Sequence, residues 1–331
     1  MKPLTHYQAC LVLFASMGMH VGPLVQIAQA AQTAELRHSK QRLITEIERP
    51  LIQTSQSENQ LAQTPPLSSN PAVDEALAEG IEHIRKDDVE AAIAAFKRAV
   101  EIDSDSSAAQ YNLGLAYRQD NQIQPAATAF WQAIQADPSF TLAYVNLGAA
   151  LLEGDNVEQA EVYLSRAIEL DPELGIAHYN FGLLERRKGN TQAALAAFNR
   201  AIALTPQAPE PHYHVGLMYQ NTGQYDQAQR AFEQAIALDS EYPEAHYNLG
   251  VTLVHQNQQE AAIAKFARAA ELLPSFGHAH YAQGLALTDL RRYSEAEAQF
   301  QAAINIYIAQ DSSRWATIAQ QQLNYVKSLP R

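Results

Sequence analysis

The chain has 331 residues, of which 47% are hydrophobic and 18% charged, and its formal net charge is −13. An acidic chain repels phosphate backbones and anionic membrane surfaces, so nucleic acid is not expected as a partner. The one cysteine, Cys10, lies in the N-terminal apolar segment. Disulfides, zinc–cysteine sites and cysteine catalysis are therefore not expected once that segment is removed.

Residues 1–30 have the layout of a secretory signal peptide. Lys2 gives a positive start, Ala9 to Met19 form an apolar centre, and Ala28-Gln29-Ala30 gives a cleavage pattern of small residues. We expect an exported protein in the periplasm or another extracytoplasmic space, without membrane insertion after cleavage. The alternative is an uncleaved N-terminal membrane anchor. Residues 31–72 are polar and interrupted by prolines, which predicts a flexible linker.

A four-residue motif close to YNLG recurs at a constant interval through the rest of the chain. Its closing glycines are 34 residues apart and form the series Gly80, Gly114, Gly148, Gly182, Gly216, Gly250 and Gly284. A fixed period of this size predicts a repeat array. With Val73 as position 1, the seven units are 73–106, 107–140, 141–174, 175–208, 209–242, 243–276 and 277–310.

The columns of the repeat predict two packed helices in each unit. Position 8 is always Gly, positions 20 and 27 are always Ala, and position 24 is Phe in six units and Leu164 in the other. A glycine inside a helix costs about 1 kcal/mol relative to alanine. Its recurrence therefore implies that a side chain at position 8 would collide with the partner helix. Proline at position 32 in four units ends the second helix.

The stretch AHYNLGVTLVHQNQQEAAIAKFARAAELLP, which follows these columns, resembles the tetratricopeptide repeat (TPR). The resemblance covers residues 73–310 and implies an all-α fold, a right-handed α-solenoid of seven helix-turn-helix repeats. Glu79 stands at position 7 of the first unit, where other units are mostly apolar, so this unit is expected to be an N-terminal cap. Residues 311–331 are predicted to form a C-terminal capping helix. One side of that helix would carry Trp315, Ile318, Ala319, Leu323 and Val326.

In tetratricopeptide proteins the stripe formed by positions 2, 5, 9, 12 and 13 lines a concave inner wall, and position 6 borders it. The resemblance thus implies a peptide-binding groove with tyrosines at position 5 and asparagines at position 6. The expected groove residues are Tyr111, Asn112, Leu115, Arg118, Asn146, Tyr179, Asn180, Leu183, Arg186, Arg187, Tyr213, Tyr247 and Asn248.

Asparagine is unfavourable inside a helix, so four at equivalent positions suggest a role. Each amide has a donor and an acceptor for an extended peptide backbone. The column resembles the asparagine ladder of the O-GlcNAc transferase superhelix, while His214 and Ala282 interrupt it. The alternative is that YNLG is a folding consensus. The arginines at positions 12 and 13 indicate either a site for a carboxylate or an ordinary solvated surface.

No catalytic motif occurs, and no cofactor or metal site is expected. The pairs His212/His214 and His278/His280 do not suggest metal ligation, because residues two apart on a helix do not face each other. We expect a non-enzymatic scaffold, adaptor or assembly factor with a protein or peptide partner. Two alternatives are a metal-ion delivery protein, motivated by the acidic charge and the histidines, and a glycan- or peptidoglycan-binding module that stacks sugars on the tyrosines.

Overall fold

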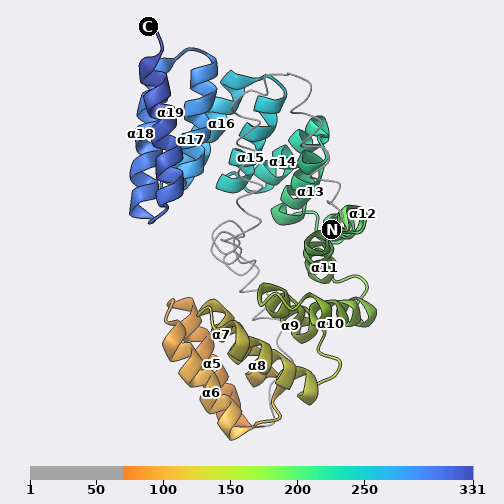
Figure 1. The fold of residues 1–331 in the computed structure, drawn as a ribbon. Coiled ribbons are helices and arrows are strands. Elements are labelled where there is room, and N and C mark those ends of the chain that lie inside the picture. Colours follow the sequence, from red (N-terminus) through yellow and green to blue (C-terminus); the bar gives the residue numbers. More distant parts are fainter. Residues whose placement is uncertain (1–69, 331) are drawn as a thin grey trace, which may run out of the picture. The chain divides into compact units, whose positions relative to one another are not determined.

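Residues 70–330 are described by the computed structural model, and every regular element among them is a helix (Figure 1). The all-α repeat fold predicted from the sequence is confirmed. The predicted signal peptide and nearly all of the predicted linker lie outside the described residues. The chain divides into two compact units, whose described parts are residues 70–240 and residues 241–330.

Each unit is built from pairs of consecutive helices, a first helix packed against a second helix. In residues 70–240 the pairs are α5 (Pro71–Arg85) with α6 (Val89–Ile102), α7 (Ser107–Gln119) with α8 (Ile123–Ala136), α9 (Thr141–Glu153) with α10 (Val157–Leu170), α11 (Gly175–Lys188) with α12 (Thr191–Leu204), and α13 (Pro209–Asn221) with α14 (Tyr225–Leu238). In residues 241–330 they are α15 (Pro243–His255) with α16 (Gln259–Leu272) and α17 (Gly277–Asp289) with α18 (Tyr293–Ala309), followed by α19 (Ser313–Ser328). No helix among residues 70–330 is long and apolar enough to span a bilayer.

The glycine at position 8 is where the two helices of a pair meet most closely. A Cβ atom added to Gly114 would lie 2.6 Å from Cε1 of Phe130, and one added to Gly148 would lie 2.6 Å from Cγ of Leu164. The same contact recurs at Gly80, Gly182, Gly216, Gly250 and Gly284. Side chains do not approach one another this closely, so the predicted reason for the glycine column is confirmed.

Every pair is closed by the same turn. The residue at position 15 has a left-handed backbone, with φ of 81° at Gly189, 73° at Gly223 and 60° at Arg291. The next residue then donates its backbone N–H to the carbonyl at position 11, as Asn190 does to Glu185 over 2.8 Å. This hydrogen bond satisfies a carbonyl that the end of the first helix would otherwise leave unpaired.

The two ends of the repeat array carry different side chains from its middle. Glu79 is 48% exposed on α5 and pairs with Arg98, whereas Leu113 and Leu147 at the same repeat position are buried. At the other end, α19 buries Ala319, Leu323 and Val326 in one apolar cluster with α17 and α18, and Trp315 and Ile318 pack partly buried against it. The five residues predicted to share one side of this helix thus meet the same core.

Candidate functional site

The first helices of residues 70–240 touch one another in sequence and form a continuous row. Helix α5 packs on α7, and α9 packs on α11, while the second helices of neighbouring pairs make no comparable packing among the described residues. Asn146 on α9 donates to the hydroxyl of Tyr111 on α7 over 3.0 Å. The rings of Tyr179 on α11 and His214 on α13 lie 5.6 Å apart. A ligand on this row would therefore meet several repeats at once.

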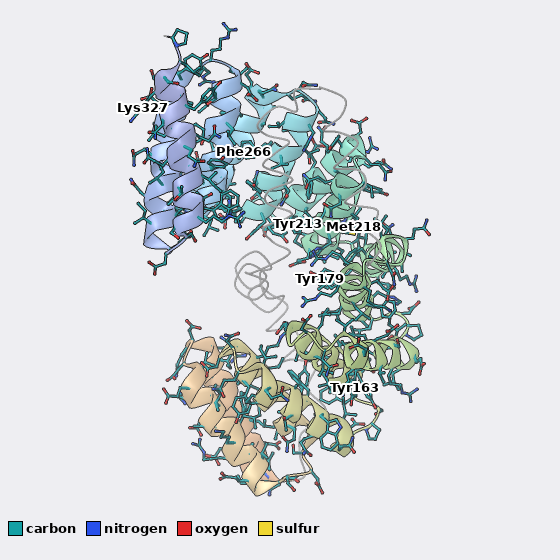
Figure 2. The ribbon with its side chains drawn as sticks, in the orientation of Figure 1. Tyr163, Tyr179, Tyr213, Met218, Phe266 and Lys327 are labelled. Atoms are coloured by element: carbon teal, nitrogen blue, oxygen red, sulfur yellow. The ribbon has the colours of Figure 1, made fainter. Side chains whose placement is uncertain are left out.

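The tyrosines at position 5 lie in the core of the repeats. Tyr111, Tyr179 and Tyr213 are between 0 and 6% exposed, and Figure 2 labels the last two on α11 and α13. Each ring packs against the phenylalanine at position 24 of its own repeat, at 5.7 Å for Tyr111–Phe130. Burial also raises the pKa of Tyr111. These rings support the helix pair and leave no flat surface for a ligand.

Tyr247, in residues 241–330, has the same arrangement with slightly more exposure. Its ring centroid lies 5.8 Å from that of Phe266 and 5.0 Å from that of Phe276, and the residue is partly exposed. The tyrosine column is therefore a packing feature in both units.

The asparagines at position 6 bond within their own helices. Each Nδ2 donates to the backbone carbonyl four residues earlier, over 2.9 to 3.0 Å, in Asn112, Asn146, Asn180 and Asn248. Asn112, Asn146 and Asn180 are at most 4% exposed. The structure thus gives the column a local role, the satisfaction of helix carbonyls, and places three of its four amides inside the packing.

Asn146 also connects two repeats. Besides its bonds to Leu142 and Tyr111, its Oδ1 accepts from Nη1 of Arg118 at 3.4 Å. The guanidinium of Arg118 is in turn paired with Glu153, and its side chain is only 10% exposed. Arg118 on α7 is therefore committed to α9.

The remaining arginines of the predicted groove lie on α11. Arg187 forms an ion pair of 2.5 Å with Asp155, which belongs to the preceding repeat. Arg186 lies near His214, and burial, together with this cation, holds the pKa of that imidazole well below its usual value. The ring of His214 stacks on Phe198 with centroids 5.3 Å apart. Arg118 and Arg187 thus have acidic partners within the fold, which leaves little reason for an acidic ligand to bind them.

Apolar side chains at position 9 become accessible towards α11 and α13. Leu115 and Ala149 on α7 and α9 are buried, whereas Leu183 on α11 and Leu217 on α13 are partly exposed. Leu217 stands in the same position 9 column as Leu183. The exposed or partly exposed residues of α7 to α13 at positions 2, 9, 12 and 13 form what we call the first-helix face: Arg118, Gln119, Glu153, Ile176, Leu183, Arg186, Arg187, Glu210, Leu217, Gln220 and Asn221.

The histidines lie on several helices, with two each on α13, α15 and α17. No group of three or more His, Cys, Asp or Glu residues that could hold a metal ion occurs within residues 70–330. His280 contacts Oε1 of Gln299 at 2.9 Å, and His278 lies among aromatic rings. Both belong to the packing of α17.

Comparisons with known proteins agree with this fold. The family model described as "Cilia and flagella-associated protein 70 C-terminal domain" matches residues 27–290, and the model described as "Tetratricopeptide repeat" matches residues 277–307. A comparison with curated protein sequences finds no match.

Solved structures show the same architecture. PilW, described as a widely conserved type IV pilus biogenesis factor, is 20% identical with a TM-score of 0.57, over 62% of this chain and 96% of its own. The Cut9–Hcn1 hetero-tetramer of the APC/C is 17% identical with a TM-score of 0.61, over 82% of this chain and 58% of its own. YrrB, described as a TPR protein with an unusual peptide-binding site, is 24% identical with a TM-score of 0.48, over 59% of this chain and 99% of its own. The first two matches support an all-α repeat solenoid.

Proposed function

Because the chain belongs to the tetratricopeptide-repeat family whose model is described as "Cilia and flagella-associated protein 70 C-terminal domain", we propose that it is a non-enzymatic interaction scaffold. In this role it is an adaptor or assembly factor that holds an extended peptide segment of a partner protein on the first-helix face. The proposal rests on fold and surface together, since a repeat fold by itself does not define a function.

The observation that carries the proposal is the accessibility of Leu183 and Leu217. They occupy the same repeat position on neighbouring first helices, and both are partly exposed while Leu115 and Ala149 are not. Apolar side chains at the centre of a surface with polar neighbours are the usual anchors of a protein interface. Arg186 and Gln220, one helical turn further along α11 and α13, supply polar groups beside them.

The ligand that fits this surface is a segment without strong charge. Arg118 and Arg187 are paired with Glu153 and Asp155 of the neighbouring repeats, so a basic or acidic peptide would have to displace an existing partner. An extended uncharged segment with apolar side chains would instead bury the leucines and leave the ion pairs in place. The proposal does not depend on the asparagine column, because most of its amides are buried.

The test is peptide selection on the full chain followed by mutation. Random peptides displayed on phage are selected against the immobilised protein, and the dissociation constants of the selected peptides are measured by fluorescence anisotropy. We expect the Leu183→Ser/Leu217→Ser double variant to weaken binding at least tenfold, because both anchors lose buried apolar area. Val162→Ser is the matched control, since Val162 is 65% exposed on the second helix α10. Equal loss in both variants, or no loss in either, would contradict the assignment of the site.

Export is a separate part of the proposal. It is supported by the charged, apolar and small-residue segments of residues 1–30. Cell fractionation and mass spectrometry of the mature N-terminus test it. A chain that begins after Ala30 in the extracytoplasmic fraction would support export, and an intact N-terminus in the cytosolic fraction would overturn it.

A further inference from the structure

The seam between the last repeat and α19 is filled by aromatic rings from four places in residues 241–330. We call Phe276, His278, Tyr281, Tyr307 and Trp315 the C-terminal aromatic cluster. Phe276 precedes α17, His278 and Tyr281 lie on α17, Tyr307 on α18 and Trp315 on α19. The cluster is the place where α19 meets both helices of the last pair.

Trp315 is the residue of α19 that makes the most ring contacts in this cluster. Its centroid lies 4.7 Å from the ring of His278 in an edge-to-face arrangement, 5.9 Å from Tyr307 in a stacked arrangement, and 6.0 Å from Tyr281. Gln310, in the turn before α19, adds a hydrogen bond of 2.9 Å to the carbonyl of Ser275. The imidazole of His278 thus contacts Trp315, the side chain that anchors α19 to the last helix pair.

His278 is partly exposed, and the rings that contact it are neutral. Its Nδ1 and the hydroxyl of Tyr307 are 2.9 Å apart, and the Tyr307 and Phe276 rings lie 5.4 and 6.4 Å from it. The titratable group that its ring contacts is the phenol of Tyr307 on α18, while Tyr281 of α17 lies beside Trp315 and Tyr247 of α15 lies near Tyr307. Burial lowers the pKa of His278 to about 4, and no carboxylate contributes to that shift.

We propose that His278 is a proton-controlled latch for α19. With a neutral imidazole, Trp315 is seated and α19 covers the end of the repeat array. Protonation places a cation among the rings of Phe276, Tyr307 and Trp315 and makes Nδ1 a donor only, so the packing that holds Trp315 is weakened and α19 detaches. Undocking exposes the face of α18 that Leu323 and Val326 cover, and this turns the last repeat into an acid-dependent interaction surface.

The expected size of the effect follows from linkage. An undocked His278 titrates near its ordinary pKa of 6.5 and a docked one near 4. Protons therefore bind the undocked state preferentially as the pH falls below 6.5. The docking equilibrium of α19 is expected to weaken on the order of 100-fold between pH 7 and pH 4. Above pH 7 it is expected to stay constant.

The experiment uses Trp315 as its own reporter. The chain has two tryptophans, so Trp131→Phe leaves Trp315 alone. Its emission maximum and acrylamide quenching are followed from pH 7.5 to pH 3.5, with hydrogen exchange of residues 313–328 read by mass spectrometry and the His278 ring proton read by NMR. As that ring titrates, we expect the emission and quenching of Trp315 to become those of a solvent-exposed indole. The amides of α19 should exchange in the same pH range, while those of α16 remain protected.

Two variants distinguish a latch from general acid unfolding, after circular dichroism at pH 7.5 shows that each is folded. His278→Gln keeps a polar partner for Tyr307 but does not titrate, so α19 should stay docked until the whole unit unfolds. Tyr307→Phe removes the phenol that bonds the neutral ring and should move undocking to higher pH. The same transition in His278→Gln as in the parent would overturn the proposal. So would titration of the ring while Trp315 keeps its docked emission, since the cation would then be held by the aromatic faces.

Discussion

The glycine column makes a quantitative prediction about the packing of each helix pair. In Gly114→Ala the new Cβ would meet three ring carbons of Phe130 at 2.6, 2.7 and 3.0 Å, and Phe130 is fully buried. Overpacking of a buried site costs about 1–3 kcal/mol, and three close contacts place this site at the upper end. The higher helix propensity of alanine returns about 1 kcal/mol. We therefore expect a net loss of about 2 kcal/mol in the free energy of unfolding.

The assay is urea unfolding followed by circular dichroism, with a matched glycine as control. Gly154 caps the C-terminal end of the first helix α9, where an added Cβ would meet only backbone oxygens at 3.5 Å, so Gly154→Ala should change stability by less than about 0.5 kcal/mol. In a Phe130→Ala background the clash is absent, and Gly114→Ala should become neutral or stabilising. Equal effects of the two glycine substitutions, or an unchanged penalty in the Phe130→Ala background, would refute the reasoning.

Three further predictions follow from the turns, the buried histidine and the spacing of the repeats. Arg291 has a left-handed backbone with φ of 60°, so Arg291→Gly should stabilise residues 241–330 by about 1 kcal/mol in urea unfolding; a loss of stability would contradict this. His214 is buried with its pKa well below 6.5, so the unfolded chain binds the extra proton and stability should fall as the pH drops through 6.5, by at most about tenfold in the unfolding constant per pH unit. His214→Asn, which restores the common residue of that column, should reduce this acid dependence, and an unchanged pH profile would count against it. Neighbouring first helices lie roughly 8–10 Å apart, close to three residues of a polyproline II segment, so selected peptides should carry apolar residues at i and i+3. A preference for i and i+2 would indicate a different bound conformation.

Much of the fold follows from local chemistry that the sequence displays directly. The 34-residue period, the glycine at position 8 and the aromatic at position 24 each have one physical explanation, and the structure contains the contacts they require. The capping helix was equally readable, because its apolar residues share one side and its polar residues the other. The contacts of the repeat columns lie within a single repeat, and the capping helix shows its apolar side in its own sequence.

The candidate site was harder to predict because it depends on the next repeat. Position 5 lies at the border of the packing face, and helical periodicity alone leaves its exposure open. Phe140, which precedes the following first helix, packs 4.7 Å from Tyr111 and closes that border. Likewise the sequence leaves Arg118 as either part of a carboxylate site or a solvated surface residue, and its pairing with Glu153 of the next repeat is visible only in the structure. The sequence did predict Leu183 as a groove residue, but that it and Leu217 are accessible while Leu115 is buried depends on their three-dimensional neighbours.

The central claim, that the first-helix face binds an extended segment of a partner, is tested most directly by site-specific photocrosslinking. A benzoylphenylalanine is introduced at Leu217 on α13 in one sample and at Val162 on the exposed side of α10 in another. After irradiation in cell extract, the crosslinked peptides are identified by mass spectrometry. We predict that position 217 captures one short segment of a partner and that position 162 captures none. Capture from position 162 alone, or the same proteins from both positions, would contradict the account.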